Sequence, residues 1–488
     1  MFCFLPGGHK GRPYDVNCFH SPKADRTENC MNIKVFFALL LGRLVRWISR
    51  VIHRGGTDMP GRIALKLCPQ LLRYLAKDVK TVAITGTNGK TSSARMVEQA
   101  FADAQLSYLA NRSGANLISG VTTEFIMNAT LTGKPKCDYA VIECDEAAAV
   151  KVFPQLRPQV VIVTNLFRDQ LDRYGEVTHT LSNIRTALTG LPETTLCLNA
   201  DCSLTASLAG DLPNKVVWYG LEKSAAPRNV PEPPVSDATH CIRCKTKYDY
   251  DYRTYAHLGG FRCPKCGYAR HAADVAVTEI VEQKLDGSTV VMDVRGARKL
   301  VRANLPAVYN IYNAAGALAA VTEMGIDVDT GIAALGHFNC GFGRMEQFPL
   351  GKAGARMVLV KNPAGCSQVL NFLQNIQEHF VLVVCLNDRG ADGTDISWIW
   401  DAEFEKLCLL GNRLERVIVS GDRAADMLIR IKYAGVPTER ITLERSYETI
   451  VSQLADEALP IVLMPTYTAM LELRSTVVRH VGGSEFWE

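Results

Sequence analysis

The sequence predicts an α/β protein with two domains in tandem, each built on a largely parallel sheet covered by helices on both faces. Two series of short β-branched segments carry this prediction, because stretches long enough for helices separate the segments within each series. The first series is TVAIT, YAVIE, VVIVTN, TLCLN and KVVWYG; the second, after residue 350, is RMVLVK, VLVVCL, RVIVS and PIVLM. A chain of 488 residues can form about three units of about 150 residues each.

The N-terminal extension, residues 1–50, contains most of the segment MNIKVFFALLLGRLVRWISRVIHRGG, which couples a short apolar run to arginines at helical spacing. The run is far shorter than the ~20 residues that span a bilayer, and no convincing cleavage site follows it. We expect an amphipathic helix packed on the body of the protein. The alternative is a helix that rests on the inner face of an anionic membrane.

The overall composition excludes several classes of protein. A net charge of +4 is small for 488 residues and indicates neither a nucleic-acid coat nor an acidic tail. Most of the 16 cysteines stand singly in apolar segments such as VVCL and KLCL, which is typical of buried thiols in a reducing compartment. We therefore expect a cytoplasmic protein.

The segment AITGTNGKTSSARM, residues 83–96, has the features of a phosphate-binding loop. A strand-like run ends at two glycines, Gly86 and Gly89, and a helix-forming stretch begins at Lys90 and Thr91. Only two residues separate the glycines, so the match to the G-x-x-x-x-G-K-[ST] consensus is incomplete. The segment can still bind phosphate, because glycines let backbone N–H groups approach an anion, lysine adds a charge and threonine offers a hydroxyl to Mg²⁺.

Polar residues follow the next predicted strands. Glu143 ends YAVIE, and the segment TNLFRDQLDRYGE after VVIV brings Asn165, Asp169 and Asp172. The carboxyl ends of parallel strands lie at one edge of the sheet, so these side chains should gather beside the loop. Taken together, they predict a site for a magnesium-bound nucleotide.

Four cysteines with C-x2-C-x18-C-x2-C spacing follow the proline-rich segment SAAPRNVPEPPVSDA. The spacing lets two turns each present two thiolates to one tetrahedral Zn²⁺, and four sulfurs leave no position for water, so the metal should be structural. The alternative is a redox pair or a coincidence. Basic residues nearby would permit nucleic-acid binding, but the neighbouring tyrosines are explained by packing, so we expect no nucleic acid. The ligands are Cys241, Cys244, Cys263 and Cys266.

Five motifs in order resemble the Mur ligases, ATP-dependent enzymes that activate a carboxylate as an acyl phosphate and let an amine attack it. GTNGKT is similar to the phosphate loop of that family, TNLFRDQLDRYGE to its T-N-x-x-x-D-H-L-D-x-x-G segment and LNADC to its L-N-x-D-D. YNIYNAAGALAA, with Asn310 and Asn313, resembles the segment near the adenine, and GRME, with Arg344, resembles the G-R-x-E motif that sends an arginine to the nucleotide.

Three departures separate the chain from the amino-acid-adding members of that family. LVKNPAG stands where those enzymes have Asp-Tyr-Ala-His-Asn-Pro, no lysine lies between Tyr174 and Leu196, and four cysteines are inserted. With RGGTDMPG and NDRGADGTDISWIWD, these features resemble the branch that amidates lipid II. That resemblance implies ATP-dependent conversion of the D-glutamate α-carboxyl to D-isoglutamine, with ammonia from a glutamine amidotransferase partner of the GatD type.

The resemblance also implies a domain arrangement and roles for individual residues. We expect a central ATP-binding domain at 51–345, a ribbon at 238–270 inserted in it and a Rossmann-like domain at 346–488. Lys90 and Glu143 would act in catalysis, with Thr91 and Glu143 on Mg²⁺. The implied nucleotide-binding residues are Gly86, Thr87, Asn88, Gly89, Lys90, Thr91, Asn165, Asp169, Asn310, Asn313 and Arg344.

Asp395, in ADGTDISW, is implied to complete the catalytic triad of the partner in a heterodimer. The alternative is an aspartate that caps the helix near Ser397, and Asp392 and Asp401 are rivals for the triad role. Two other functions stay open. One is another carboxylate–amine ligase of the folylpolyglutamate synthase type, and the other is a non-catalytic module that binds nucleotide and zinc.

Overall fold

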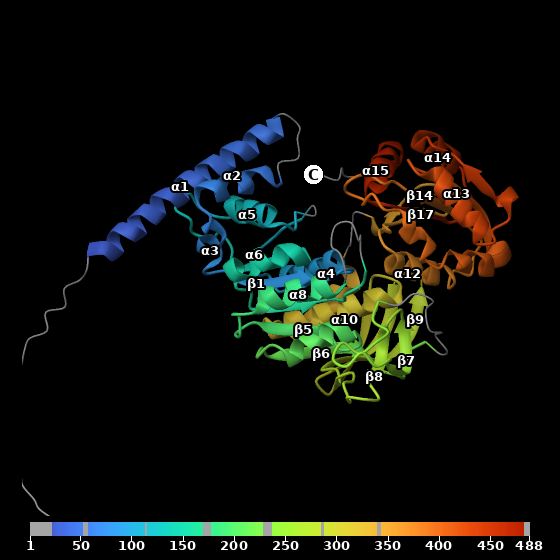
Figure 1. Ribbon diagram of the computed structural model, residues 1–488. Coiled ribbons are helices and arrows are strands. Elements are labelled where there is room, and N and C mark those ends of the chain that lie inside the picture. The colour runs from blue at the N-terminus through green and yellow to red at the C-terminus, as the bar shows by residue number, and fades with distance from the viewer. Residues whose placement is uncertain are drawn as a thin grey trace, which may run out of the picture.

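The computed structural model describes residues 22–51, 57–112, 115–168, 177–227, 237–284, 287–338 and 343–482, with side chains from residue 33 onward. Two α/β bodies lie side by side, and a long N-terminal helix runs along the outside of the first (Figure 1). The predicted fold class is confirmed, since both series of predicted strands form parallel sheets.

The central body is built on a nine-stranded sheet with the order β11-β10-β9-β6-β5-β4-β1-β3-β2. Strands β1 to β6 and β9 pair in parallel, and β9, β10 and β11 pair antiparallel. The strands are β1 (Lys80–Thr85), β2 (Tyr108–Ala110), β3 (Tyr139–Glu143), β4 (Val160–Val163), β5 (Thr195–Asn199), β6 (Val216–Leu221), β9 (Val275–Lys284), β10 (Gly287–Val294) and β11 (Ala297–Ala303).

The antiparallel strands are a difference from the sequence prediction, which anticipated only the parallel part. Strands β10 and β11 are joined by a tight turn at Arg295 and Gly296, which both have positive φ, 53° and 91°. Two consecutive residues of positive φ are the signature of a type I′ hairpin, which matches the twist of the strands it joins. The hairpin widens the sheet on the side away from β1.

Helices cover both faces of the central sheet. One layer holds α4 (Lys90–Asp103), α10 (Val308–Glu323) and α11 (Val328–His337), which pack on one another, and the other holds α6 (Glu146–Leu156) and α8 (Val177–Leu188). After β5 come the short α9 (Ser203–Ala206) and the 3₁₀ turn η1 (Ser207–Gly210). The strands between the layers are almost wholly buried, as expected for a sheet covered on both faces.

The second body has a six-stranded sheet with the order β12-β13-β17-β14-β15-β16, in which only β12 is antiparallel. Its strands are β12 (Arg344–Phe348), β13 (Ala355–Val358), β14 (Phe380–Cys385), β15 (Leu414–Ser420), β16 (Ile441–Leu443) and β17 (Ile461–Pro465). Its helices are α12 (Pro363–Leu373), α13 (Ala424–Tyr433), α14 (Tyr447–Leu454) and α15 (Tyr467–Val481), with 3₁₀ segments η2 (Ser397–Trp400), η3 (Phe404–Arg413) and η4 (Thr438–Arg440).

The N-terminal helices form a layer on the central body. Helix α1 (Pro22–Val51) lies along α2 (Met59–Leu67) and touches α5 (Ile118–Met127), while α3 (Leu71–Ala76) packs on α5 and α6. Val35, Ala38 and Leu39 of α1 are buried in this contact. Among the residues that the structure describes, no helix combines the length and the apolar character that crossing a bilayer requires.

A small ribbon is inserted between β6 and β9. It contains the hairpin of β7 (Asp249–Tyr255) and β8 (Leu258–Arg262) and has its own core around Tyr248, Phe261 and Tyr268. Asp201, fully buried after β5, ties the ribbon to the sheet because it accepts hydrogen bonds from Arg270 Nε at 2.6 Å and from the Leu221 amide at 2.9 Å. Burial raises the pKa of Asp201, and the charge of Arg270 opposes that shift.

Replacement of Asp201 by alanine should therefore destabilise the central body. The change leaves the mostly buried Arg270 without its main partner, which costs about 3–5 kcal/mol in comparable pairs. The matched control is Glu222→Ala, which removes the more exposed partner of Arg270 and should cost less than about 1 kcal/mol. Chemical denaturation measures both, and equal losses would contradict this role for Asp201.

Candidate active site

The turn between β1 and α4 has a backbone that only glycine supplies without strain. Gly86 has a φ of 117° and Gly89 a φ of 89°. A Cβ on Gly86 would lie 2.3 Å from Thr164 Oγ1, and one on Gly89 would lie 2.1 Å from Asn313 Oδ1. The turn therefore presses its backbone against the end of β4 and against α10, and it ends at the N-terminus of a 14-residue helix. This is the geometry of a phosphate-binding loop.

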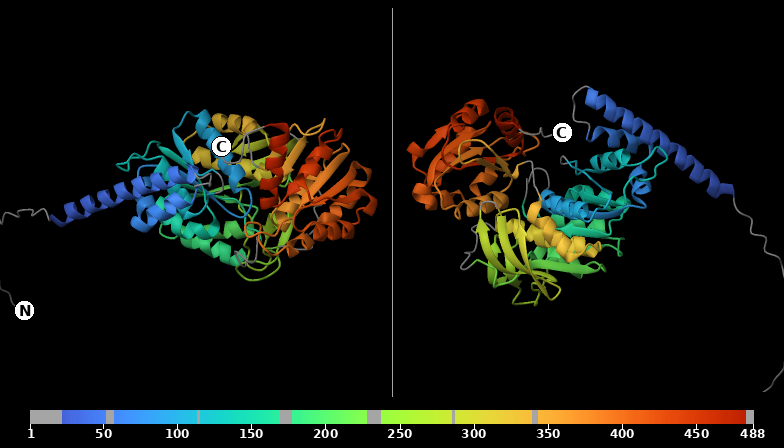
Figure 2. Two further views of the ribbon diagram at one scale, coloured as in Figure 1. Left: turned by 90° about the horizontal axis from the view of Figure 1, so that it is seen from above. Right: turned by 180° about the vertical axis from the view of Figure 1, so that it is seen from behind.

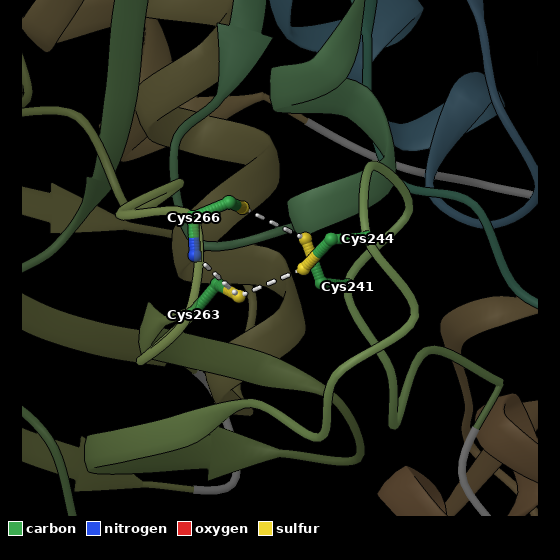
Figure 3. Close-up of side chains that lie close together, drawn as sticks. All are labelled: Cys241, Cys244, Cys263 and Cys266. Carbon is green, nitrogen blue, oxygen red and sulfur yellow. Dashed lines mark hydrogen bonds between the residues drawn. The ribbon is translucent and has the colours of Figure 1, made fainter.

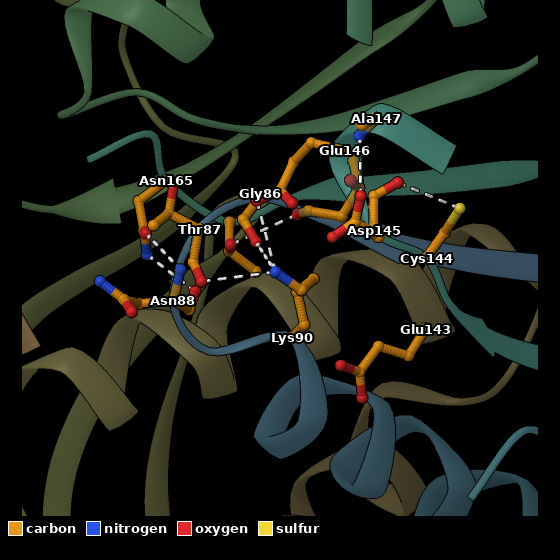
Figure 4. A network of polar contacts seen from close by, with 12 residues as sticks. Gly86, Thr87, Asn88, Lys90, Glu143, Cys144, Asp145, Glu146, Ala147 and Asn165 are labelled. Atoms are coloured by element: carbon orange, nitrogen blue, oxygen red, sulfur yellow. Dashed lines mark hydrogen bonds and ion pairs between the residues drawn. The ribbon is translucent and has the colours of Figure 1, made fainter. Parts of the chain in front are cut away.

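Asn165, just after β4, holds the turn in place by bonding both backbone groups of one residue, Asn88. The Asn88 amide donates to Asn165 Oδ1 at 3.0 Å, and Asn165 Nδ2 donates to the Asn88 carbonyl at 3.0 Å. The Thr87 amide also donates to the Asn165 carbonyl at 2.8 Å. Figure 4 shows the Asn165 amide facing Asn88 across this paired contact. The loop conformation is thus fixed by the neighbouring strand.

Lys90 points back into the loop (Figure 4). Its Nζ donates to the Gly86 carbonyl at 2.5 Å, lies 3.4 Å from the Thr87 carbonyl and forms an ion pair with Glu146 at 3.3 Å. Its side chain is only 11% exposed. The ammonium group therefore has to exchange these partners before it can contact an anion outside the loop. Glu146, which begins α6, is a residue that sequence reasoning missed.

Thr91 and Glu143 lie together, as the sequence predicts for residues at neighbouring strand ends. The Thr91 hydroxyl donates to Glu143 Oε2 at 2.8 Å. Asn111 fixes the backbone of Glu143, because the Glu143 amide donates to Asn111 Oδ1 at 2.8 Å and Asn111 Nδ2 donates to the Glu143 carbonyl at 2.7 Å. A hydroxyl and a carboxylate beside a phosphate loop are oxygen donors of the kind that Mg²⁺ takes. Sequence reasoning did not find Asn111.

A pocket opens beside the loop, and residues of both bodies line it. The central body contributes Asn88 and Gly89, together with Asn310 and Asn313 of α10, and the second body contributes Arg344. The two bodies also touch directly, because Asn362 Nδ2 donates to Asn88 Oδ1 at 3.1 Å. The structure therefore brings most of the predicted nucleotide-binding residues to one place. Asp169 and Asp172 lie outside the described residues.

The ribbon reaches this pocket too, which the sequence did not indicate. Tyr255, at the end of β7, lines the pocket and stacks on Phe167 with ring centroids 5.9 Å apart. Phe167 is held in turn by the loop, since its amide donates to Thr87 Oγ1 at 3.1 Å. Both rings are almost fully buried, so they close this side of the pocket with apolar surface.

The four predicted cysteines form a compact cluster, with all sulfurs within 4.8 Å of one another (Figure 3). Cys241 and Cys266 are 3.6 Å apart and Cys244 and Cys263 are 3.4 Å apart, measured between Sγ atoms. Hydrogen bonds from Thr246 lower the pKa of the Cys244 thiol to about 6. Four thiols that converge from two turns are the donor set of a structural zinc site, so the residues fit that metal.

The three aspartates considered for the triad role differ in their surroundings. Asp395 is exposed and accepts a hydrogen bond from the Ser397 amide at 2.8 Å at the start of η2, and its hydrogen bonds with Ser397 lower its pKa. Asp392 is buried, accepting from the Thr468 amide at 2.8 Å. Asp401 pairs with Arg168 of the central body at 2.5 Å. Asp395 is therefore the most accessible of the three.

Two family models match the chain, the Mur ligase middle domain over residues 84–249 and the MurT ligase C-terminal domain over residues 359–470. A curated relative, the lipid II isoglutaminyl synthase (glutamine-hydrolyzing) subunit MurT of Streptococcus pneumoniae, is 34% identical over 449 residues, which cover 91% of this chain and 97% of that protein. The chain belongs to the MurT family. The MurT subunit of Staphylococcus aureus is 32% identical over 461 residues, 92% of this chain and 99% of that protein.

This MurT family protein has the fold of the Mur ligases, as its similarity to solved structures shows. A pseudomurein peptide ligase type C from Methanothermus fervidus superposes with a TM-score of 0.60 at 21% identity, covering 83% of this chain and 79% of that one. MurF from Acinetobacter baumannii gives a TM-score of 0.62 at 15% identity, covering 86% and 80%. Membership of the MurT family makes the chain an enzyme of the ligase class and a subunit of a larger assembly.

Proposed function

We propose that this chain is the ligase subunit of a lipid II isoglutaminyl synthase, which uses ATP to convert the α-carboxyl of the D-glutamate in lipid II to an amide. The observation that carries the proposal is the near-complete coverage of the MurT relatives, which extends through the phosphate loop and the second body. The pocket between the two bodies supports it, because a ligase must hold ATP and an acceptor at one junction.

The loop would bind the triphosphate of ATP. The dipole of α4 and the N–H groups of the turn favour negative charge at Gly89, and Asn310, Asn313 and Arg344 would contact the rest of the nucleotide. Lys90 would leave the carbonyls of Gly86 and Thr87 for the phosphates and spread the charge of the transferring phosphoryl group. Thr91 and Glu143 would hold Mg²⁺, which offsets negative charge on the phosphates.

The chemistry then proceeds in two balanced steps. An oxygen of the substrate carboxylate attacks the γ-phosphorus of ATP, the bond to the bridging oxygen breaks, and ADP leaves. Ammonia next attacks the carbonyl carbon of the acyl phosphate, phosphate departs with the original carboxylate oxygen, and one proton is lost from nitrogen. Ammonia is small, which fits a second body that presents Lys361 at the pocket and Asn362 to Asn88 of the loop in place of a site for an amino acid.

A glutamine amidotransferase of the GatD type would supply the ammonia, with Asp395 as the third member of its triad. The exposure of Asp395 and its lowered pKa support this role, because such a residue has to reach the partner while staying ionised. Two aromatic side chains are exposed on the same body, since Trp400 of η2 is 52% exposed and packs on the exposed Tyr433. Exposed aromatic residues are common at protein interfaces.

The cysteine cluster would hold one structural Zn²⁺. Four sulfur ligands leave no open position, so the metal takes no part in the reaction itself. Its effect on the site would pass through Tyr255, which belongs to the ribbon hairpin and lines the pocket.

Lys90→Ala should lower ATP-dependent amidation of lipid II by at least about 10²–10³-fold, because it removes a donor that acts on the transferring phosphoryl group. The partner should still co-purify, since Lys90 is far from Asp395 in the sequence and lies in the other body. Lys80→Ala, an exposed lysine on the same strand–loop–helix unit, is the matched control and should keep its rate. Normal turnover by the Lys90 variant would refute its assignment.

Asp395→Asn should spare ATP binding and ammonium-driven amidation but lower glutamine-driven amidation by about 10²–10⁴-fold. Asp401→Asn, which changes a rival aspartate on the same segment, should keep both activities. Mass spectrometry of lipid II with glutamine or with ammonium chloride as the nitrogen source measures the difference. Failure of ammonium to rescue the Asp395 variant would contradict the triad role.

Cys263→Ser should lose the bound zinc and weaken ATP binding several-fold, because an unfolded ribbon no longer positions Tyr255. Cys408→Ser, which changes an exposed cysteine outside the cluster, is the control and should keep both properties. Metal analysis gives the zinc content and calorimetry gives the ATP affinity. If the variant lost zinc but bound ATP as tightly as the wild type, the proposed contribution of the ribbon to ATP binding would be wrong.

A further inference from the structure

Helix α1 carries a large apolar face that no other described element covers. Eight apolar side chains between residues 33 and 51 are exposed, from 40% for Phe36 to 64% for Trp47. At 3.6 residues per turn, they fall within an arc of about 120° on one side of the helix. They are Ile33, Phe36, Phe37, Leu40, Leu44, Trp47, Ile48 and Val51. We call this set the outer face of α1.

The outer face points away from the protein. Val35, Ala38 and Leu39 on the opposite side of α1 are buried, and the helix packs on α2 and α5. Figure 1 and the right view of Figure 2 show α1 at the outer edge of the molecule. The face is therefore not a poorly packed part of the core, because the helix already has a separate buried side.

Basic residues flank the apolar side chains of the outer face. The chain has no acidic residue between Glu28 and Asp58, whereas Lys34 and Arg50 are exposed and stand on either flank of the outer face. An apolar strip with tryptophan and phenylalanine, bordered by basic residues and free of acidic ones, is the pattern of a helix that lies in the interface of an anionic bilayer. The residues from 33 to 51 extend about 27 Å along a convex helix, which suits a flat surface.

We infer that the outer face of α1 docks the protein on the surface of an anionic phospholipid bilayer, with the helix parallel to the membrane plane. The exposed side chains and their flanking charges are the evidence for docking on the membrane. The role of docking rests on the proposed function, because an enzyme that amidates a lipid-linked peptide works best at the membrane in which that lipid is anchored. Docking would confine the search for substrate to the membrane surface.

Flotation with vesicles tests the inference on the full-length chain in complex with its glutaminase partner. The wild type should float with vesicles of phosphatidylcholine and phosphatidylglycerol, and added salt should weaken the binding. Phe37→Asp combined with Trp47→Asp should lower the bound fraction at least about tenfold, because it puts two charges in the apolar face that would enter the bilayer. Leu300→Asp, an equally exposed leucine on β11, is the matched control and should bind as the wild type does.

A second pair of measurements separates docking from folding and from catalysis. The double variant should keep its melting temperature and its rate on a soluble short-chain analogue of lipid II, and it should lose rate only on lipid II embedded in vesicles. The inference is overturned if the wild type does not float, if the double variant floats equally well, or if the outer face proves to mediate self-association without vesicle binding. Failure of the wild type on the soluble analogue would count against the proposed function and leave the flotation result standing.

Discussion

The candidate site depends on one constraint, that the four residues from Gly86 to Gly89 hold a conformation which no chain with side chains on both glycines could adopt. The Asn165 side chain bonds the amide and the carbonyl of Asn88. These two hydrogen bonds maintain that conformation, because they join the end of β4 to the turn after β1. A turn whose backbone is fixed in advance needs little backbone rearrangement to accept an anion, whereas the Lys90 side chain has to exchange its partners. Strands β1 and β4 are neighbours in the sheet, so the turn after β1 lies beside Asn165.

Other parts of the molecule converge on that turn. The second body reaches it through Asn362, and the pocket is closed on another side by Tyr255 of the ribbon. The ribbon is itself anchored to the sheet through Asp201 and Arg270. Two of the three departures from the amino-acid-adding ligases thus have different structural consequences. The cysteine insertion contributes Tyr255 to the wall of the pocket, and the altered segment around Asn362 contacts the loop at Asn88 directly.

The strands and the tight turn after β1 could be predicted from the sequence, because buried parallel strands are continuous apolar runs and closely spaced glycines favour a turn with positive φ. The cysteine spacing likewise predicted a cluster that forms. Features that depend on tertiary partners could not be predicted. Asn111 reaches Glu143 from the segment just after β2, and Lys90 turns into the loop toward Glu146. The glycine of the Arg295–Gly296 turn is typical of a tight hairpin, but arginine is not typical of the position before it. The sequence therefore did not predict the β10–β11 hairpin.

The central claim is that the carboxylate of the substrate receives the terminal phosphoryl group of ATP. Lipid II labelled with ¹⁸O in the α-carboxyl of its D-glutamate tests this most directly, with mass spectrometry of the inorganic phosphate released during amidation. The account predicts one ¹⁸O atom in the phosphate for each amide formed, because phosphate leaves with a carboxylate oxygen. Amide formation with unlabelled phosphate, or with pyrophosphate as the product, would contradict it.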